Sequence, residues 1–342
     1  MSAIKPEFLG ARLLISVAAL IIVIAGLQTA QSILVPFLFA LFLAILGAGP
    51  MQYMEKKGIP LFIAVLLVTV FILGILFGIG YLLSRSLDSF LVALPEYRER
   101  FITLVPSLNH YLQDFDIKLS AEDVRSSLET STVFAWAGKA AGNLVTWFKS
   151  ILLVLILMVF MLFEASALRK KIQSALSVAI DVESLGEVAG DVQKYLAIKT
   201  FTSAMTGTFV YFWVLLFGID FAILWGLIAF LFNFIPVIGS IVASIPAIVL
   251  CLITQDLGTT IALSVGYIII NVGISNFFEP ILFGRRLGLS PLVVFLSLLF
   301  WGFIWGPAGM LLSIPLTMVV KIFLEHSDEF KWIAGLMGSK VA

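Results

Sequence analysis

The chain is poor in charged residues and has a single cysteine. Only 12% of its 342 residues are charged, and 21 basic residues balance 21 acidic ones. A soluble domain carries about 25% charged residues, whereas here 61% of the residues are hydrophobic and the mean hydropathy is +1.11. The zero net charge gives no attraction to nucleic acid, and Cys251 has no partner with which to build a disulfide framework. The composition therefore predicts an all-α polytopic membrane protein embedded in a lipid bilayer.

Motifs that common enzyme classes need are also missing. The sequence has no G-x-x-x-x-G-K-[ST] loop for ATP and no H-E-x-x-H zinc motif. His110 and His326 both lie outside the apolar segments, and no apolar segment holds paired aspartates for an intramembrane protease. We therefore expect no enzymatic activity, no cofactor and no metal. Transport would then be driven by the gradient of a coupling ion, proton or sodium, or by the gradient of the solute itself.

About eight hydrophobic segments are expected. A membrane-spanning helix needs about 20 apolar residues. The first five candidates are Leu13–Leu27, Ile33–Gly49, Leu61–Leu83, Ser150–Phe163 and Phe201–Phe217. The others are a helix over 258–275 and two longer uncharged segments, 221–254 and 292–320.

Both long uncharged segments are interrupted. The first breaks at Asn233–Gly239, around a proline, and the second breaks at Trp305–Gly309, around another. As single helices they would measure roughly 50 and 44 Å, but the hydrocarbon core is only about 30 Å thick. Each segment is therefore either a tilted, kinked span or a re-entrant hairpin of two half-depth helices.

Basic residues near the span ends predict the orientation. The basic groups at 5–12, 56–57 and 169–171 fall on one face if the first four spans alternate. That face is cytoplasmic by the positive-inside rule, which places both termini in the cytoplasm and 84–149 outside. Re-entrant hairpins would also place Arg285-Arg286 on the cytoplasmic face, so this rule favours hairpins over kinked spans.

The outer segment carries a heptad stripe of apolar side chains from Leu87 to Phe115. Pro95 and Pro106 interrupt the stripe, so one straight helix is not expected. The stripe predicts either a helical hairpin that packs on itself or a contact between subunits.

The predicted divisions are 1–83 (N-terminal transmembrane helices), 84–149 (extracytoplasmic helical domain), 150–200 (fourth span and cytoplasmic amphipathic helix), 201–256 and 257–323 (two repeat units, each a helix plus a broken helix or hairpin) and 324–342 (cytoplasmic tail).

The two broken segments read as an internal repeat. Three short matches relate them: Phe217-Gly218-Ile219-Asp220 with Leu287-Gly288-Leu289-Ser290, Pro236-x-x-Gly239 with Pro307-x-Gly309, and Ser244-Ile245-Pro246 with Ser313-Ile314-Pro315. On the hairpin interpretation the two units enter the membrane from opposite sides. Such an inverted-topology repeat is typical of secondary transporters, which bind their substrate near the midplane at broken helices.

The breaks are the predicted site of solute or ion binding. A helix N-terminus follows each proline, and its free N–H groups suit anionic or hydrogen-bonding ligands. Polar side chains at the breaks add donors and acceptors, although the same small and polar residues also pack membrane helices. Glu279 either binds a coupling cation or proton, or caps a helix. The candidate pathway residues are Asn233, Pro236, Gly239, Ser240, Asn276, Glu279, Trp305, Gly306, Pro307, Gly309 and Ser313, with Asp220, Arg285 and Arg286 as candidate charge partners.

Two C-terminal motifs resemble the signature of the autoinducer-2 exporter family, which are bacterial permease-like membrane proteins. They read Asn276-Phe-Phe-Glu279-Pro280-Ile-Leu-Phe-Gly284-Arg-Arg-Leu-Gly288-Leu-Ser-Pro291 and Trp305-Gly306-Pro307-Ala-Gly309-Met-Leu-Leu-Ser-Ile-Pro315. The resemblance covers nearly the whole chain, with Ser290 at a position where many relatives carry histidine. It implies export of autoinducer-2 or a related small polar solute across the bacterial inner membrane. It also implies a homo-oligomer, a pentamer, with an elevator-like moving domain.

Three functions are consistent with these features. The first is a secondary transporter or facilitator for a small polar solute. The second is sodium(lithium)/proton antiport, which the resemblance implies for some relatives and which would need a carboxylate such as Glu279 or Asp220. The third is a non-transporting membrane scaffold, which would use the heptad stripe but would leave both breaks without a role.

Overall fold

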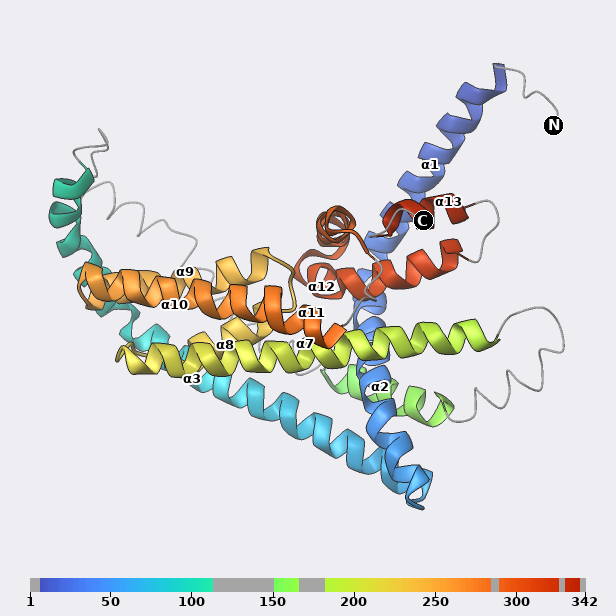
Figure 1. Cartoon of the computed structure of the whole chain (residues 1–342), viewed down its shortest axis with the longest axis horizontal. Helices are drawn as coiled ribbons and strands as arrows, with labels where there is room; N and C mark the ends of the chain where they lie inside the picture. Colours follow the sequence, from blue (N-terminus) through green and yellow to red (C-terminus); the bar gives the residue numbers. More distant parts are fainter. Residues whose placement is uncertain (1–6, 113–150, 166–181, 284–288, 326–329, 339–342) are drawn as a thin grey trace. The chain divides into compact units, whose positions relative to one another are not determined.

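The computed structural model describes residues 7–112, 151–165, 182–283, 289–325 and 330–338, and these residues form α-helices joined by short turns (Figure 1). Throughout the described part there is no β-strand. The helices are α1 (Glu7–Thr29), α2 (Gln31–Lys56), α3 (Leu61–Leu112), an unlabelled helix (Ile151–Ala165), α7 (Val182–Leu216), α8 (Ala222–Phe232), α9 (Ile238–Thr254), α10 (Leu257–Gly273), the π-helix η2 (Ile274–Phe278), α11 (Glu279–Phe283), α12 (Pro291–Glu325) and α13 (Lys331–Met337).

The apolar helices confirm a polytopic membrane protein. By length and composition, four described helices could cross a membrane, namely Gln31–Lys56, Leu61–Leu104, Leu257–Phe283 and Pro291–Glu325. Four shorter stretches of helix are also apolar, namely Val17–Thr29 within α1, Ile151–Ala165, Ala222–Phe232 and Ile238–Thr254. Large apolar side chains cover the exposed faces of these helices, as expected where lipid rather than water is the solvent.

The chain forms two compact units. Unit 1 comprises Met1–Ile45, Leu153–Val192 and Gly288–Ala342. Unit 2 comprises Leu46–Leu152 and Gln193–Leu287. Unit 2 therefore holds the first broken segment together with α10, whereas unit 1 holds the second broken segment.

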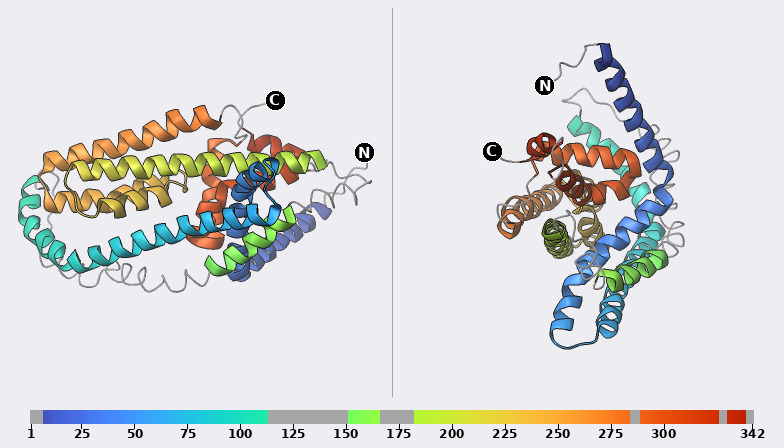
Figure 2. Two further views of the ribbon diagram at one scale, coloured as in Figure 1. Left: turned by 90° about the horizontal axis from the view of Figure 1, so that it is seen from below. Right: turned by 90° about the vertical axis from the view of Figure 1, so that its right-hand side faces the viewer.

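In unit 2, α3 is a single helix that reaches far beyond the predicted span. Neither Pro95 nor Pro106 ends it, but Figure 2 shows that its C-terminal part bends, so it is not straight. The Phe90 and Tyr97 rings, both on the predicted heptad stripe, pack edge-on against Phe221. The stripe therefore contacts the start of α8 within the same chain, while its last position, at 115, lies outside the described residues.

The first broken segment of unit 2 is a helical hairpin. The helices α8 and α9 pack against each other on either side of a turn at 233–237 (Figure 1). Trp225 near the start of α8 and Leu250 near the end of α9 belong to one buried cluster, which requires the two helices to run antiparallel. At about 1.5 Å per residue, the 11 residues of α8 are too short to cross the bilayer.

The second broken segment, in unit 1, reverses in the same way. Although α12 is continuous by hydrogen bonding, Trp305 (φ −127°, ψ 15°) and Gly306 (φ 61°, ψ −142°) leave helical geometry, and the ribbon changes direction in Figure 1. The Trp301 indole N–H donates to the Thr317 hydroxyl at 3.0 Å. Sixteen residues of straight helix would separate these residues by about 24 Å, so the two halves of α12 fold back on each other. The length of α12 therefore does not make it one straight span.

Equivalent glycines close the two turns. A Cβ on Gly239 would overlap the carbonyl oxygen of Phe232, and a Cβ on Gly309 would overlap that of Trp301. In each case the carbonyl belongs to the last turn of the preceding half-helix. The repeated Pro and Gly positions in the sequence therefore correspond to the same local packing in both segments.

A third close approach joins α7 to α8. A Cβ on Gly207 would lie 2.7 Å from the carbonyl oxygen of Gly226, and a Cβ on Gly226 would lie 2.8 Å from that of Gly207. Small residues at such crossings let membrane helices come into backbone contact. No side-chain layer separates α7 from α8 at this point.

Candidate functional site

Between residues 199 and 206, helix α7 buries a row of polar side chains. Lys199, Thr202, Ser203 and Thr206 are all buried, with at most 6% of their surface exposed. Phenylalanines such as Phe209 lie on its exposed face. This polarity is the reverse of a soluble protein's and suits a membrane helix that lines a polar interior. The stretch 199–206 is therefore the centre of the candidate site.

A buried ion pair joins α7 to α11. The Lys199 ammonium lies 2.6 Å from the Glu279 carboxylate, and only 8% and 16% of the two side chains are exposed. The Thr202 hydroxyl also reaches this carboxylate, at 3.1 Å, and lies 3.2 Å from the Lys199 backbone carbonyl. Charged groups inside a membrane protein are unfavourable unless paired, and they commonly mark ion or substrate pathways. The pair satisfies the two charges locally and adds no net charge to the interior.

The turn of the first hairpin reaches the same part of α7. Asn233, 3% exposed, donates from its amide to the Ser203 hydroxyl at 3.0 Å. Since Ser203 directly follows Thr202, the predicted residues Asn233 and Glu279 contact adjacent positions of one helix. The site therefore collects polar groups from α7, from the first turn and from the start of α11.

The helix before Glu279 changes its hydrogen-bond register. Ile274–Phe278 form a π-helix, in which the Glu279 N–H donates to the Ile274 carbonyl. Pro280 has no N–H to donate, so one carbonyl of the preceding turn has no helical donor. This carbonyl is that of Ser275 if the helix continues in π register, or that of Asn276 if it returns to α register. Such π segments are frequent at functional sites. The Asn276 side chain itself is exposed.

The turn of the first hairpin is strained. Val237 has φ 60° and ψ −60°, and the Ile238 N–H donates to the Pro236 carbonyl at 2.6 Å. A positive φ is unfavourable for a β-branched residue, and this γ-turn geometry is rare. Gly239 is buried behind the turn and Ser240 is half-buried. Helix α9 starts at Ile238, shortly after Pro236, as the sequence predicted.

The predicted residues of the second break lie in unit 1 and are held by α1. The Trp305 indole donates to the Leu27 carbonyl at 2.9 Å. Gly306 supplies the positive φ, Pro307 is exposed, and Gly309 packs on the preceding half of α12. Ser313, fully buried, donates to the Met310 carbonyl. That the two breaks face one another across a shared site stays a prediction.

The predicted charge partners are placed unevenly. Asp220 is exposed and accepts a hydrogen bond from Tyr97 at 2.6 Å, which ties the turn before α8 to α3. Its carboxylate therefore has a packing role in unit 2. Arg285 and Arg286 lie outside the described residues.

Several polar residues of the interior were not predicted. Lys199, Thr202, Ser203 and Thr206 recur at helical spacing at the start of an otherwise apolar segment, and this spacing is the signal that could have identified them. On α10, the Tyr267 hydroxyl and the Asn271 side-chain oxygen are buried without a hydrogen-bond partner among the described residues.

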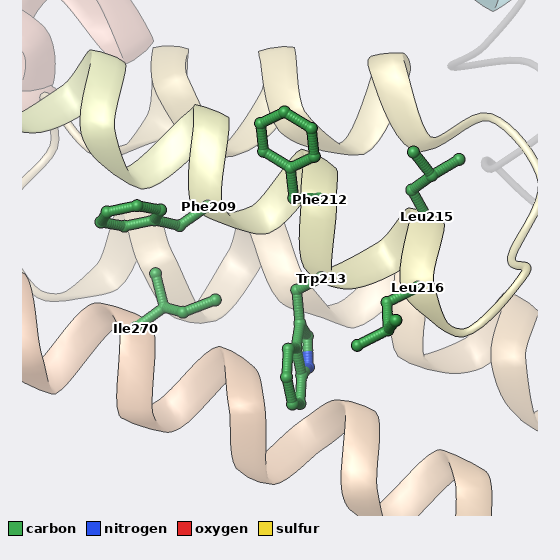
Figure 3. A pocket seen from close by; sticks show the side chains of 6 residues that line it. All are labelled: Phe209, Phe212, Trp213, Leu215, Leu216 and Ile270. Atoms are coloured by element: carbon green, nitrogen blue, oxygen red, sulfur yellow. The ribbon is translucent and has the colours of Figure 1, made fainter.

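The groove between α7 and α10 differs chemically from the polar interior. Figure 3 shows side chains on both helices around it, and all are apolar or aromatic: Phe209, Phe212, Trp213, Leu215, Leu216 and Ile270. Such a lining suits a lipid chain rather than a polar solute. In the described residues no three His, Cys, Asp or Glu side chains are placed to hold a metal ion.

An apolar exterior, buried polar groups and two broken helices define the class of polytopic membrane transport proteins. The chain belongs to the AI-2E family of transporters, whose family model matches residues 14–329. It is thus a membrane transporter by family and not an enzyme.

Relatives match over nearly the full length. The AI-2 transport protein TqsA of Escherichia coli K12 is 35% identical over 332 residues, which cover 96% of both chains. A protein of Haemophilus influenzae, whose name proposes transport without stating a solute, is 36% identical over 334 residues and 96% of both chains. The resemblance seen in the C-terminal motifs is therefore confirmed.

Proposed function

We propose that this protein is a secondary transporter or facilitator that exports a small polar solute such as autoinducer-2. The observation that carries the proposal is the buried polar face of α7 at 199–206, which meets the first turn at Asn233 and the helix start at Glu279. A polar interior in lipid is useful when a polar solute passes through it. The solute is suggested by the name of TqsA, and family membership favours transport over a scaffold role.

The binding site is built around the breaks. We assign solute contacts in unit 2 to Asn233, Ser240 and the backbone near Gly239, with Glu279 as the ion-coupling group. The second break, Trp305–Gly309 with Ser313, would complete the pathway if the two hairpins are re-entrant and related by an inverted repeat. Alternating access would then follow from an elevator-like moving domain.

The topology and assembly complete the proposal. Both termini lie in the cytoplasm, the protein resides in the bacterial inner membrane, and it forms a homo-oligomer, a pentamer. In a variant with Cys251→Ala and Arg286→Cys, a membrane-impermeant thiol reagent should label position 286 only from the cytoplasmic side. Labelling only from outside would contradict the re-entrant hairpins.

Counterflow in proteoliposomes tests the transport itself. Vesicles preloaded with unlabelled autoinducer-2 should take up labelled autoinducer-2 in a saturable way, which a channel would not show. The double variant Asn233→Leu/Ser203→Ala removes both partners of one buried hydrogen bond and should slow uptake. Ser244→Ala, which removes a hydroxyl that bonds only the neighbouring Ile241 carbonyl, is the matched control. Absence of saturable uptake, or equal uptake by both variants, would count against the proposal.

A second candidate is exchange of sodium or lithium for protons. It is favoured by the Glu279 carboxylate, which is only 16% exposed and is the type of group that such exchange needs. Glu279→Gln should then abolish cation-driven proton movement in proteoliposomes, and persistent exchange would remove this candidate.

A further inference from the structure

The Glu279 carboxylate has a hydroxyl oxygen beside it and directly follows a π-helix. The Thr202 hydroxyl oxygen lies 3.1 Å from it. The π-helix and Pro280 leave a backbone carbonyl of the preceding turn without a helical donor. Backbone carbonyls of unwound helices bind the coupling cation in other secondary transporters. Carboxylate, hydroxyl and carbonyl oxygens are the ligands that hard cations prefer.

A cation already occupies this position. The Lys199 ammonium lies 2.6 Å from the Glu279 carboxylate, in a place where 8% of the lysine and 16% of the glutamate side chain are exposed. The ammonium is tethered to α7 and carries a single positive charge. A free ion could take its place only by competing with it.

We propose that Glu279, Thr202 and the freed carbonyl form a site for a monovalent alkali cation, in which Lys199 is a tethered competitor. This inference rests on the proposed transport function and names the coupling ion's site. One carboxylate matches one positive charge, and within the described part no group of three or more His, Cys, Asp or Glu side chains is placed to hold a metal ion. When sodium or lithium binds Glu279, the Lys199 ammonium is released from the carboxylate. It is then available to the oxygen atoms of a solute next to Ser203 and Asn233.

Two other ionisable residues flank the site. Lys194, one turn earlier on α7, donates to the Phe283 carbonyl at 3.5 Å. Tyr195 stacks on the Phe283 ring at a centroid distance of 5.7 Å. Both contact the far end of α11, so Lys199 remains the cation that Glu279 contacts in the described structure.

Thermal unfolding of the purified full-length protein tests the site. Unfolding is followed in sodium, lithium, potassium or choline chloride at one ionic strength, so that the screening of charges is the same in each salt. The wild type should unfold at a higher temperature in sodium or lithium than in choline. The shift should grow in Lys199→Met, because the competitor is gone and the carboxylate needs a counter-ion.

The double variant Lys199→Met/Glu279→Gln is the critical comparison. It removes both charges and so leaves no unpaired charge buried, which lets it fold even if the single variant does not. Its unfolding temperature should be the same in all four salts. Lys321→Met, which removes a lysine paired with Glu325 elsewhere, should respond to the salts as the wild type does.

The outcomes separate this inference from the proposed function. Equal cation responses in the wild type and the double variant would overturn the cation site. If saturable autoinducer-2 counterflow persists in that case, solute transport stands without it. A cation response without counterflow would instead support the site and contradict the proposed solute.

Discussion

Replacing Gly239 by alanine should break the first hairpin. The new Cβ would overlap the Phe232 carbonyl oxygen and lie 2.8 Å from its carbonyl carbon and 3.0 Å from the Ile235 Cβ. Carbon atoms prefer about 3.5–4.0 Å, so α9 would have to move away from α8 by roughly 1 Å. Because the obstacle is backbone, no rotamer change relieves the overlap. We expect a destabilisation of about 3 kcal/mol, the upper end of the usual range for overpacking.

The single cysteine gives a direct assay. Cys251 in α9 is fully buried and unpaired, so a thiol-reactive fluorophore reports on unfolding of this hairpin in detergent without any engineered label. Gly239→Ala should lower the midpoint of this transition, and counterflow should fall as well, since Asn233 directly follows Phe232. Gly309→Ala should likewise lower counterflow, because its Cβ would lie 2.6 Å from the Trp301 carbonyl carbon in the second hairpin.

The control is Gly74→Ala in α3, where an added Cβ meets nothing within 4 Å. Alanine is preferred to glycine in helices by about 1 kcal/mol, so this variant should be at least as stable as the wild type. If Gly239→Ala were as stable as Gly74→Ala, the hairpin would be refuted. A kinked single span would bring no carbonyl close to Gly239.

Three further changes have expected signs. Tyr97→Phe removes the hydrogen bond to Asp220 and should lower the free energy of unfolding by about 1 kcal/mol. Tyr267→Phe removes a buried hydroxyl without a described partner and should leave the unfolding midpoint equal or higher. A larger loss of stability in Tyr267→Phe than in Tyr97→Phe would contradict the packing. Val237→Gly relieves a positive φ that stores about 1–3 kcal/mol and should raise the midpoint, since the Val237 side chain is 74% exposed and little packing is lost; a lower midpoint would show that the strain is absent. Hydrogen bonds from the Thr259 hydroxyl and then from its backbone N–H lower the pKa of Asp256. The contribution of Asp256 to stability is therefore complete above the usual aspartate pKa of about 3.9 and is lost as the pH falls through the lowered value. The difference in midpoint between the wild type and Asp256→Ala should be largest at neutral pH and shrink in acid, and a constant difference would contradict this assignment.

The sequence was informative where a rare residue interrupts an apolar segment. Asn233 and Glu279 stand out among apolar neighbours, and both lie at the polar interior of unit 2. The repeated glycines at 239 and 309 were found from the spacing of Pro and Gly, because a helix turn in lipid has few alternatives to small residues. These features are determined by residues close together in the chain, so they can be predicted from a single sequence.

Long-range pairing could not be predicted in this way. Lys199 and Glu279 are 80 residues apart, and the sequence assigned the residues up to 200 to a fourth span and a cytoplasmic amphipathic helix. The partner of Lys199 depends on which face of α7 packs against α11, and local helix propensity does not determine that packing. The bond between Trp301 and Thr317 is similar, since it exists only because α12 folds back. The choice between kinked span and hairpin therefore had to come from tertiary contacts.

The direct backbone contact between Gly207 and Gly226 has a mechanical consequence. A layer of side chains between two helices acts as a cushion, because rotamers can absorb small displacements. Here α7 and α8 meet without such a layer, and α7 also carries Lys199, Thr202 and Ser203. A movement of α7 that follows a change of the Glu279 partner would therefore move α8 and the turn at Asn233 by the same amount, because no side chains between the helices can absorb it.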